Sequence, residues 1–175
     1  MSSKPTLCVA GASGLVGSHI IRAALLAGYG VNGTLRDAGD PTKAPYLRAL
    51  PHGEERLRLF SADMFEEGAF DAATEGTDGV FIACLIPVYK GVDGTPAREM
   101  DDERGYAEII NPTVEGCLNI MRSAARGGVR NVVICSSTSS TNPVPAVPRK
   151  NEVDHWSDEV EQCRAKKYTS ATKTV

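Results

Sequence analysis

The sequence predicts an α/β fold built on a doubly wound parallel sheet, and three observations lead to this prediction. Short apolar segments alternate with segments of helical periodicity along the 175 residues. The apolar run at residues 79–84 is nearly continuous, which is typical of a parallel strand covered on both faces. The first apolar segment leads directly into a glycine-rich turn that opens a helix.

Strands and helices follow one another along the chain. We expect strands at residues 6–10, 31–35, 56–60, 79–84 and 129–135. We expect helices from the glycine turn to about residue 27, at 41–50, 66–74 and 106–126, and from about residue 157 onward. Helical crossovers imply one parallel sheet of about five strands, with the fifth strand at an edge. Since no sixth strand is evident, we expect residues 1–175 to form a single, incomplete domain without a substrate lobe.

Two segments carry more specific expectations. In the helix at residues 106–126, one apolar stripe is predicted to face the core, and it consists of Ile110, Val114, Leu118 and Met121. Residues 86–104 are rich in glycine, proline and charge, so we expect an exposed excursion there.

The composition is that of a globular protein, with a hydrophobic fraction of 42% and a charged fraction of 23%. A net charge of −3 gives no general attraction to nucleic acid or to an anionic membrane. The segment at residues 6–10 is too short for the core of a secretory leader or for a membrane span. The five cysteines form no C-x-x-C pair and the three histidines lack ligand spacing. We therefore expect a cytoplasmic protein without disulfides and without a metal site.

The glycine turn has the spacing G-x-x-G-x-x-G, at Gly11, Gly14 and Gly17. Glycines also serve ordinary turns, but a position between the first strand and a helix favours a dinucleotide-binding motif of the Rossmann type. Gly11 permits the tight turn, Gly14 lets a pyrophosphate approach the backbone, and Gly17 lets the helix pack on the sheet. Backbone N–H groups and the helix dipole would hold the phosphates. The predicted contacts are Gly11, Ser13, Gly14, Leu15, Val16 and Gly17.

Two competing motifs are absent from the sequence. No Gly-Lys-Ser/Thr follows the turn, which argues against a nucleotide triphosphatase, and no G-x-S-x-G occurs, which argues against an α/β-hydrolase.

Arg36 and Asp37 follow the second predicted strand, about 20 residues beyond the last glycine. At this position an acidic residue binds the ribose 2′-hydroxyl of NAD, whereas an arginine binds the 2′-phosphate of NADP. Arg36 is nearer to the strand end and Lys43 adds a second positive charge, so NADPH is favoured over NADH. A solvated arginine at a strand end is the alternative.

Several blocks of the sequence resemble, in the same order, the extended short-chain dehydrogenases/reductases. The blocks are residues 11–18, 34–37, 62–68, 79–81, 111–116 (Asn-Pro-Thr-Val-Glu-Gly) and 132–137 (Val-Val-Ile-Cys-Ser-Ser). Residues 156–158 and 163–167 make the branch of plant dihydroflavonol reductase and cinnamoyl-CoA reductase the most similar one. The resemblance covers nearly the whole chain.

The resemblance implies an NADPH-dependent reductase acting on a carbonyl of a phenolic or related small molecule. Arg36 and Lys43 would hold the 2′-phosphate. The pairs that would lie near the cofactor are Asp63 and Met64, at the adenine, and Ala83 and Cys84, after the fourth strand.

The resemblance also implies a catalytic group. Ser137 matches the serine that hydrogen-bonds the substrate carbonyl, although turn and capping roles are the alternative in the hydroxyl-rich run at residues 136–141. In the family a tyrosine donates the proton, and a lysine binds the nicotinamide ribose and lowers the pKa of that tyrosine. Tyr168 and Lys173 are the candidates here.

The spacing of this pair departs from the family's Tyr-x-x-x-Lys by one residue. On a regular helix a spacing of five places the two side chains about 140° apart, so both cannot face the nicotinamide. A π-bulge or a late helix start would restore the geometry. Aligning Lys173 with the family's lysine instead puts Thr169 at the tyrosine position.

Members of the family continue well beyond this helix, so the resemblance implies a C-terminally truncated chain. The alternative to a reductase is a non-catalytic NADP-binding or interaction module. In this family helices equivalent to residues 106–126 and 157–175 pair across a dimer interface, which makes a homodimer, or association through these helices, the expected partnership. An epimerase or dehydratase of the same superfamily tends to bind NAD, and Arg36 argues against it.

Overall fold

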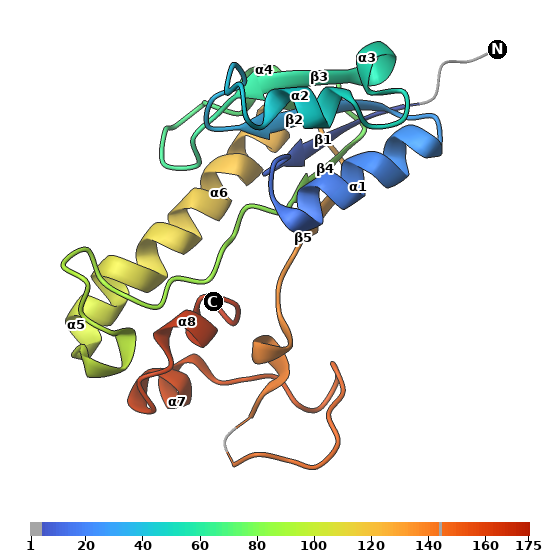
Figure 1. Cartoon of the computed structure of the whole chain (residues 1–175). Helices are drawn as coiled ribbons and strands as arrows, with labels where there is room; N and C mark the ends of the chain where they lie inside the picture. The colour runs from blue at the N-terminus through green and yellow to red at the C-terminus, as the bar shows by residue number, and fades with distance from the viewer. Residues whose placement is uncertain (1–4, 144) are drawn as a thin grey trace. The chain divides into compact units, whose positions relative to one another are not determined.

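The computed structural model describes residues 5–143 and 145–175, which form two compact units (Figure 1). Unit 1 contains the chain up to Leu85 together with Gly116–Cys135, and unit 2 contains Ile86–Glu115 and Ser136–Val175. Each unit has its own hydrophobic core, and each is described by itself. That residues 1–175 make one domain stays a prediction.

Unit 1 contains a five-stranded sheet in the order β3-β2-β1-β4-β5, and all its neighbouring strands are parallel. The strands are β1 (Thr6–Ala10), β2 (Gly30–Leu35), β3 (Leu57–Ser61), β4 (Gly79–Ile82) and β5 (Val132–Ile134). From β1 the chain adds β2 and β3 on one side and then β4 and β5 on the other. The strand order therefore reverses beside β1, where the carboxyl ends of β1, β2 and β4 are neighbours. The predicted doubly wound parallel sheet is confirmed.

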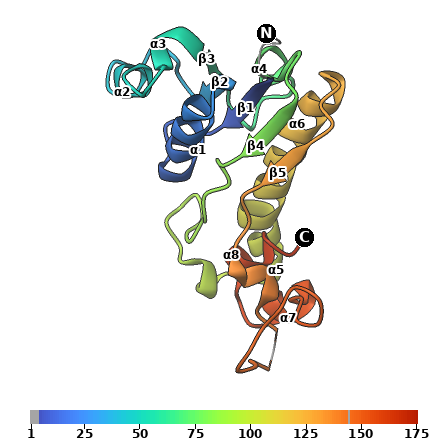
Figure 2. The ribbon, with the colours of Figure 1, turned by 90° about the vertical axis from the view of Figure 1, so that its right-hand side faces the viewer.

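Helices cover both faces of this sheet (Figure 2). One face packs against α1 (Leu15–Leu26) and α2 (Ala44–Arg48), and Ile21, Leu25 and Leu47 are fully buried there. The other face packs against α4 (Asp71–Thr74) and the second half of α6 (Asn111–Arg126). The short helix α3 (Gly53–Arg56) precedes β3. Burial on both faces explains why the central strands are almost wholly apolar.

Strand β5 lies at the edge of the sheet, as the sequence predicts. Within the described residues it pairs with β4 alone. Its three side chains, Val132, Val133 and Ile134, are 37%, 50% and 40% exposed. The strand is also shorter than the predicted segment at residues 129–135.

Two expectations about the helices of unit 1 are wrong. The predicted helix at residues 66–74 is reduced to α4, because Gly68 has a φ of +76° and breaks the helical path. Of the predicted apolar stripe, Ile110 is buried but Met121 is 38% exposed, and the buried apolar side chains in the second half of α6 are instead Ile120 and Ala124. Asn119 is buried next to them because its amide nitrogen donates to backbone carbonyl oxygens of the loop after β3.

Unit 2 is built from short helices. They are a 3-10 turn (Ala97–Glu99), α5 (Asp102–Gly105), a π-helical turn (Tyr106–Ile110) that continues into α6, a second 3-10 turn (Thr138–Thr141), α7 (Glu159–Arg164) and α8 (Tyr168–Ala171). The core of this unit contains Met100, Ile109, Cys163 and Tyr168. The excursion expected at residues 86–104 is exposed over most of its length, but Ala97 and Met100 are buried in this core.

The helix predicted from residue 157 onward is interrupted. Lys166 lies between α7 and α8 with a φ of +56°, a conformation that ends a right-handed helix. In the part of the chain that the structure describes, no helix combines the length and the apolar character that crossing a membrane requires.

Candidate functional site

The first glycine of the turn meets the chain that leaves β4. Gly11 has a φ of +91°, and a Cβ atom built on it would lie 2.9 Å from Cβ and 3.0 Å from Cα of Cys84. Both the conformation and the close approach exclude a side chain. Gly17 is equally constrained, because a Cβ atom there would lie 2.1 Å from the carbonyl oxygen of Gly11.

Gly14 differs from the other two glycines. It has a φ of −75°, which any residue adopts, and it precedes the first residue of α1 as its N-cap. A Cβ atom at Gly14 would meet, among the described residues, only the Gly11 carbonyl oxygen, at 3.4 Å. The fold of the chain therefore leaves room for a side chain at Gly14. This is the arrangement expected where a ligand, rather than the protein, approaches the backbone.

Neighbouring elements hold the turn in place. Thr34, in β2, accepts a hydrogen bond from the Gly11 N–H at its hydroxyl oxygen (3.4 Å) and one from the Ala12 N–H at its carbonyl oxygen (2.7 Å). Tyr46 of α2 donates its hydroxyl to the Ser13 carbonyl oxygen at 3.2 Å. The turn is thus fixed before any ligand arrives, and it presents the positive end of the α1 dipole, which suits a phosphate. Leu15 and Val16 are 79% and 50% exposed at the start of that helix.

The charged groups after β2 have different surroundings. Asp37 accepts a hydrogen bond from the Gly39 N–H at 2.8 Å, so its carboxylate serves the local turn. Lys43 pairs with Asp40 at 3.0 Å. The hydroxyl of Thr42, and then Lys43, hold the pKa of the Asp40 carboxyl well below its usual range. Arg36 is exposed and makes no ion pair within residues 5–143 and 145–175. Arg36 is therefore the cation that is free to meet an anion.

The loop after β3 carries the next two candidates. Asp63 accepts a hydrogen bond from the Phe65 N–H at 3.0 Å, which closes a tight turn. Met64 is half-buried. Both residues stand just beyond the carboxyl end of β3, beside the end of β2 that carries Arg36.

Ala83 and Cys84 continue from β4. The Ala83 N–H donates to the Ala10 carbonyl oxygen at 2.9 Å, which extends the pairing of β1 and β4 by one step. Cys84 then lies directly against Gly11. The structure therefore brings the unit 1 candidates to the carboxyl ends of β1, β2, β3 and β4.

Ser137 lies in unit 2 and is exposed. Its hydroxyl oxygen accepts a hydrogen bond from the Ser139 N–H at 3.2 Å, and its carbonyl oxygen accepts one from the Ser140 hydroxyl at 2.7 Å. Ser137 thus caps the 3-10 turn that follows it. The hydroxyl proton of Ser137 takes no part in the bond from Ser139, so capping leaves it available for donation.

Tyr168 is fully buried in unit 2. Its hydroxyl donates to the Asp102 carboxylate at 2.6 Å and accepts from the Lys166 ammonium at 3.0 Å. The ring lies on Gly105, where a Cβ atom would approach the ring to 2.5 Å. Burial, followed by the bond to Asp102, raises the pKa of Tyr168, while Lys166 acts in the opposite direction. This is the opposite of the lowered pKa that an acid donating at neutral pH needs.

Lys173 lies beyond the last residue of α8 and is half-buried. Tyr168 and Lys173 therefore do not share one regular helix, and the lysine in contact with Tyr168 is Lys166. Thr169, the residue at the alternative tyrosine position, donates its hydroxyl to the Val88 carbonyl oxygen.

Sequence reasoning missed several residues that shape these groups. Thr34 and Tyr46 hold the glycine turn, and Asp102 and Lys166 hold Tyr168. The available signal for Thr34 was a polar residue near the end of a largely apolar strand. Nothing in the sequence pairs Tyr168 with Asp102, since they are 66 positions apart. Within the described residues, no group of three or more His, Cys, Asp or Glu side chains is arranged to hold a metal ion.

Comparisons with known proteins agree with this geometry. A family model described as NAD(P)H-binding matches residues 11–173. The chain is 38% identical over 157 residues to dihydroflavonol 4-reductase of Callistephus chinensis, covering 89% of this chain and 40% of that protein. It is 36% identical over 160 residues to cinnamoyl-CoA reductase CAD2 of Medicago truncatula, covering 90% and 46%. The resemblance found in the sequence is confirmed.

A solved structure extends the likeness to three dimensions. Vestitone reductase from alfalfa (Medicago sativa) superposes with a TM-score of 0.67 at 27% identity, covering 98% of this chain and 49% of that one. The chain spans about half the length of the relatives it matches.

Proposed function

The chain belongs to the NAD(P)H-binding family, and on that premise we propose that it binds NADPH and serves the reduction of a carbonyl group in a phenolic or related small molecule. The observation that supports the cofactor-binding part of this proposal is the glycine turn. Gly11 and Gly17 are required by the protein's own packing, whereas Gly14 is left bare at the start of α1. A phosphate at that place would accept hydrogen bonds from backbone N–H groups and would meet the positive end of the helix dipole.

The surroundings of Arg36 support NADPH over NADH. The Arg36 guanidinium is exposed at the end of β2, and a 2′-phosphate would give it a charge-assisted, bidentate partner. The Asp37 carboxylate is occupied by the Gly39 N–H. Lys43 would contribute less, because Asp40 already neutralises part of its charge. Asp63 and Met64 would border the adenine, and Ala83 and Cys84 would border the nicotinamide half.

The substrate class rests on the relatives. Their printed names are those of reductases of dihydroflavonols and cinnamoyl-CoA. The bound cofactor would supply the hydride, and the chain would orient the carbonyl and supply the proton. Ser137 would donate its hydroxyl to the carbonyl oxygen, and Tyr168 would supply the proton. Lys173 is the counterpart of the family's lysine, but the lysine that contacts the Tyr168 hydroxyl here is Lys166.

A second candidate function has its own support. The Tyr168 hydroxyl is buried and already donates to Asp102, so it would have to leave that bond before it could protonate a substrate. A chain in which it does not leave would bind NADPH without turnover. Such a binding module would associate with a second copy or a longer relative through the helices at residues 106–126 and 157–175.

The cofactor-binding part of the proposal is tested by titrating the purified chain with NADPH and with NADH and monitoring cofactor fluorescence. We expect tighter binding of NADPH, with the preference lost in Arg36→Glu. Arg130→Glu is the matched control, because it makes the same charge change at an exposed site before β5. Failure of the folded chain to bind either cofactor would overturn the proposal.

Turnover separates the two candidate functions. Consumption of NADPH with cinnamoyl-CoA or a dihydroflavonol, abolished in Tyr168→Phe with NADPH affinity unchanged, supports the reductase with Tyr168 as the acid. Turnover that survives in Tyr168→Phe removes Tyr168 from that role. Tight NADPH binding without turnover of any tested carbonyl supports the binding module.

A further inference from the structure

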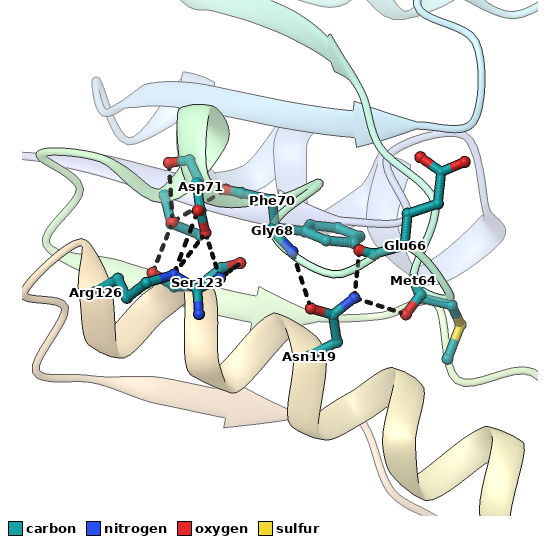
Figure 3. A network of polar contacts seen from close by, with 9 residues as sticks. Met64, Glu66, Gly68, Phe70, Asp71, Asn119, Ser123 and Arg126 are labelled. Atoms are coloured by element: carbon teal, nitrogen blue, oxygen red, sulfur yellow. Dashed lines mark hydrogen bonds and ion pairs between the residues drawn. The ribbon is translucent and has the colours of Figure 1, made fainter.

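One side chain of α6 binds backbone groups of the loop that follows β3 (Figure 3). Asn119 is 5% exposed, and its amide nitrogen donates to the carbonyl oxygens of Met64, at 3.1 Å, and Glu66. Its amide oxygen accepts a hydrogen bond from the Gly68 N–H at 3.3 Å. A single asparagine thus binds three backbone groups of a five-residue stretch.

These contacts require an asparagine at this place. The loop offers two acceptors and one donor, and among short side chains only an amide carries two N–H groups and a carbonyl oxygen together. An aspartate at position 119 would set a negative charge against the two carbonyl oxygens. An apolar residue would leave three partly buried backbone groups without their partner, which is costly.

The Met64 side chain packs against Gly116, which lies one helical turn before Asn119. A Cβ atom at Gly116 would lie 2.1 Å from Cε and 3.3 Å from Cγ of Met64. The methionine side chain therefore fills the space that the missing side chain leaves on α6. Because Cε is the end of a flexible side chain, a methyl group at Gly116 would displace the thioether rather than the backbone.

The rest of the network in Figure 3 fixes a different element. Arg126 pairs with Asp71 at 2.7 Å, and Thr74 donates its hydroxyl to the Ser123 carbonyl oxygen at 3.1 Å. These contacts tie α4 to the last turns of α6. Hydrogen bonding to Arg126 lowers the pKa of the Asp71 carboxyl. This half of the network meets the stretch held by Asn119 at its last residue, where the Asp71 N–H donates to the Gly68 carbonyl oxygen at 3.0 Å, and the side-chain hydrogen bonds of Arg126 go to Asp71 and Ser123.

We propose that Asn119 and Gly116 are positioning residues for the adenine half of the dinucleotide: Asn119 holds the backbone of residues 64–68 and Gly116 holds the Met64 side chain. The inference rests on the proposed function, which places Asp63 and Met64 beside the adenine. It adds that α6 sets the affinity for the adenine half through contacts that never reach the ligand.

Binding of two half-ligands to the full chain tests this role. Adenosine 2′,5′-bisphosphate probes the adenine half, and reduced nicotinamide mononucleotide probes the other half. In Asn119→Ala we expect the affinity for the bisphosphate to fall about tenfold, which is the effect of losing roughly one net buried hydrogen bond. The affinity for the mononucleotide should stay unchanged. Arg126→Gln, which loosens α4 without touching residues 63–66, should change neither.

Gly116→Ala is the second variant, and it serves if Asn119→Ala does not fold. Alanine favours the helix, so the chain should remain folded while the displaced Met64 weakens bisphosphate binding alone. Equal loss for both half-ligands, or equal effects of Arg126→Gln and Asn119→Ala, would show a merely structural role and overturn the proposal. Bisphosphate affinity that is unchanged in both variants would also overturn it. A wild-type chain that binds neither the bisphosphate nor NADPH overturns the proposed function itself, which is a separate result.

Discussion

At the scale of single residues, the three glycines of the turn have different causes. Gly11 is required because its φ is positive and because Cys84 lies too close for a side chain. Gly17 is required because a side chain there would clash with the carbonyl oxygen of Gly11. Both are consequences of how β1, α1 and the end of β4 pack. Neither backbone conformation nor packing requires a glycine at position 14, because its φ suits any residue and the protein leaves space beside it. The fold therefore requires Gly11 and Gly17, whereas the glycine at position 14 is explained by the proposed binding of a cofactor.

Substitutions by alanine should separate these requirements. Gly14→Ala is expected to fold with nearly unchanged stability but to bind NADPH at least about tenfold more weakly, because the added methyl group stands where the pyrophosphate would approach. Gly17→Ala is expected to lose several kcal/mol of stability, roughly the cost of forcing two packed backbones apart. Urea denaturation and cofactor titration of both variants check this. Equal destabilisation by the two substitutions would contradict the distinction.

At the scale of elements, β1 is the centre of unit 1, with β2 on one side and β4 on the other. Its Cys8 is completely buried between the sheet and α4 and α6. Burial, and then the proximity of Cys84, raise the pKa of the Cys8 thiol to about 12. A fully covered central strand keeps this thiol in its neutral form.

The shifted pKa of Cys8 predicts a loss of stability at alkaline pH. An unfolded cysteine begins to lose its proton near pH 9, whereas the folded one holds it to about pH 12. Below pH 9 both states are protonated, so this contribution is fully present. As the pH rises above 9 the unfolded state binds fewer protons, and stability falls by at most about 1.4 kcal/mol per pH unit.

Urea denaturation between pH 7 and pH 10.5 measures this effect. Other groups titrate in the same range, so the comparison is with Cys8→Ala, whose stability should fall less steeply with pH. Cys135→Ala, at a half-buried site beyond β5, is the control and should keep the slope of the wild type. Parallel curves for the wild type and Cys8→Ala would contradict the prediction.

At the scale of the whole molecule, the candidates divide between the two units. All cofactor candidates lie in unit 1, and Ser137, Tyr168 and Lys173 lie in unit 2. Each unit has its own core. The proposed roles therefore assign binding and turnover to different parts of the chain, and the two can be tested separately. The chain also spans about half the length of its relatives, so binding is the property to establish first.

Cofactor binding should stabilise the molecule by mass action. With free NADPH at one hundred times its Kd, the free energy of unfolding of unit 1 should rise by about 2.7 kcal/mol, and removal of NADPH should reverse the change. Hydrogen exchange should slow in β1, the glycine turn and β2. Gly14→Asp should show neither effect. Stabilisation of that variant to the same extent as the wild type would place the cofactor elsewhere.

The sequence by itself determined the succession of strands and helices along the chain, the parallel sheet and the glycine turn. These depend on short-range physics: apolar runs mark strands buried on both faces, and a positive φ or a close backbone approach demands glycine within a few residues of β1. Arg36 could be located because its place is set by the length of one strand–helix–strand unit.

Only the tertiary structure decided which partners the other residues take. Tyr168 pairs with Asp102 and Lys166 rather than lying with Lys173 on one helix, and Asn119 binds a loop 55 positions away in the sequence. On α6, Ile120 and Ala124 are buried in the core, whereas the predicted Met121 is exposed. Burial and hydrogen bonding between distant segments fix these choices, and neither periodicity nor spacing along the chain carries that information.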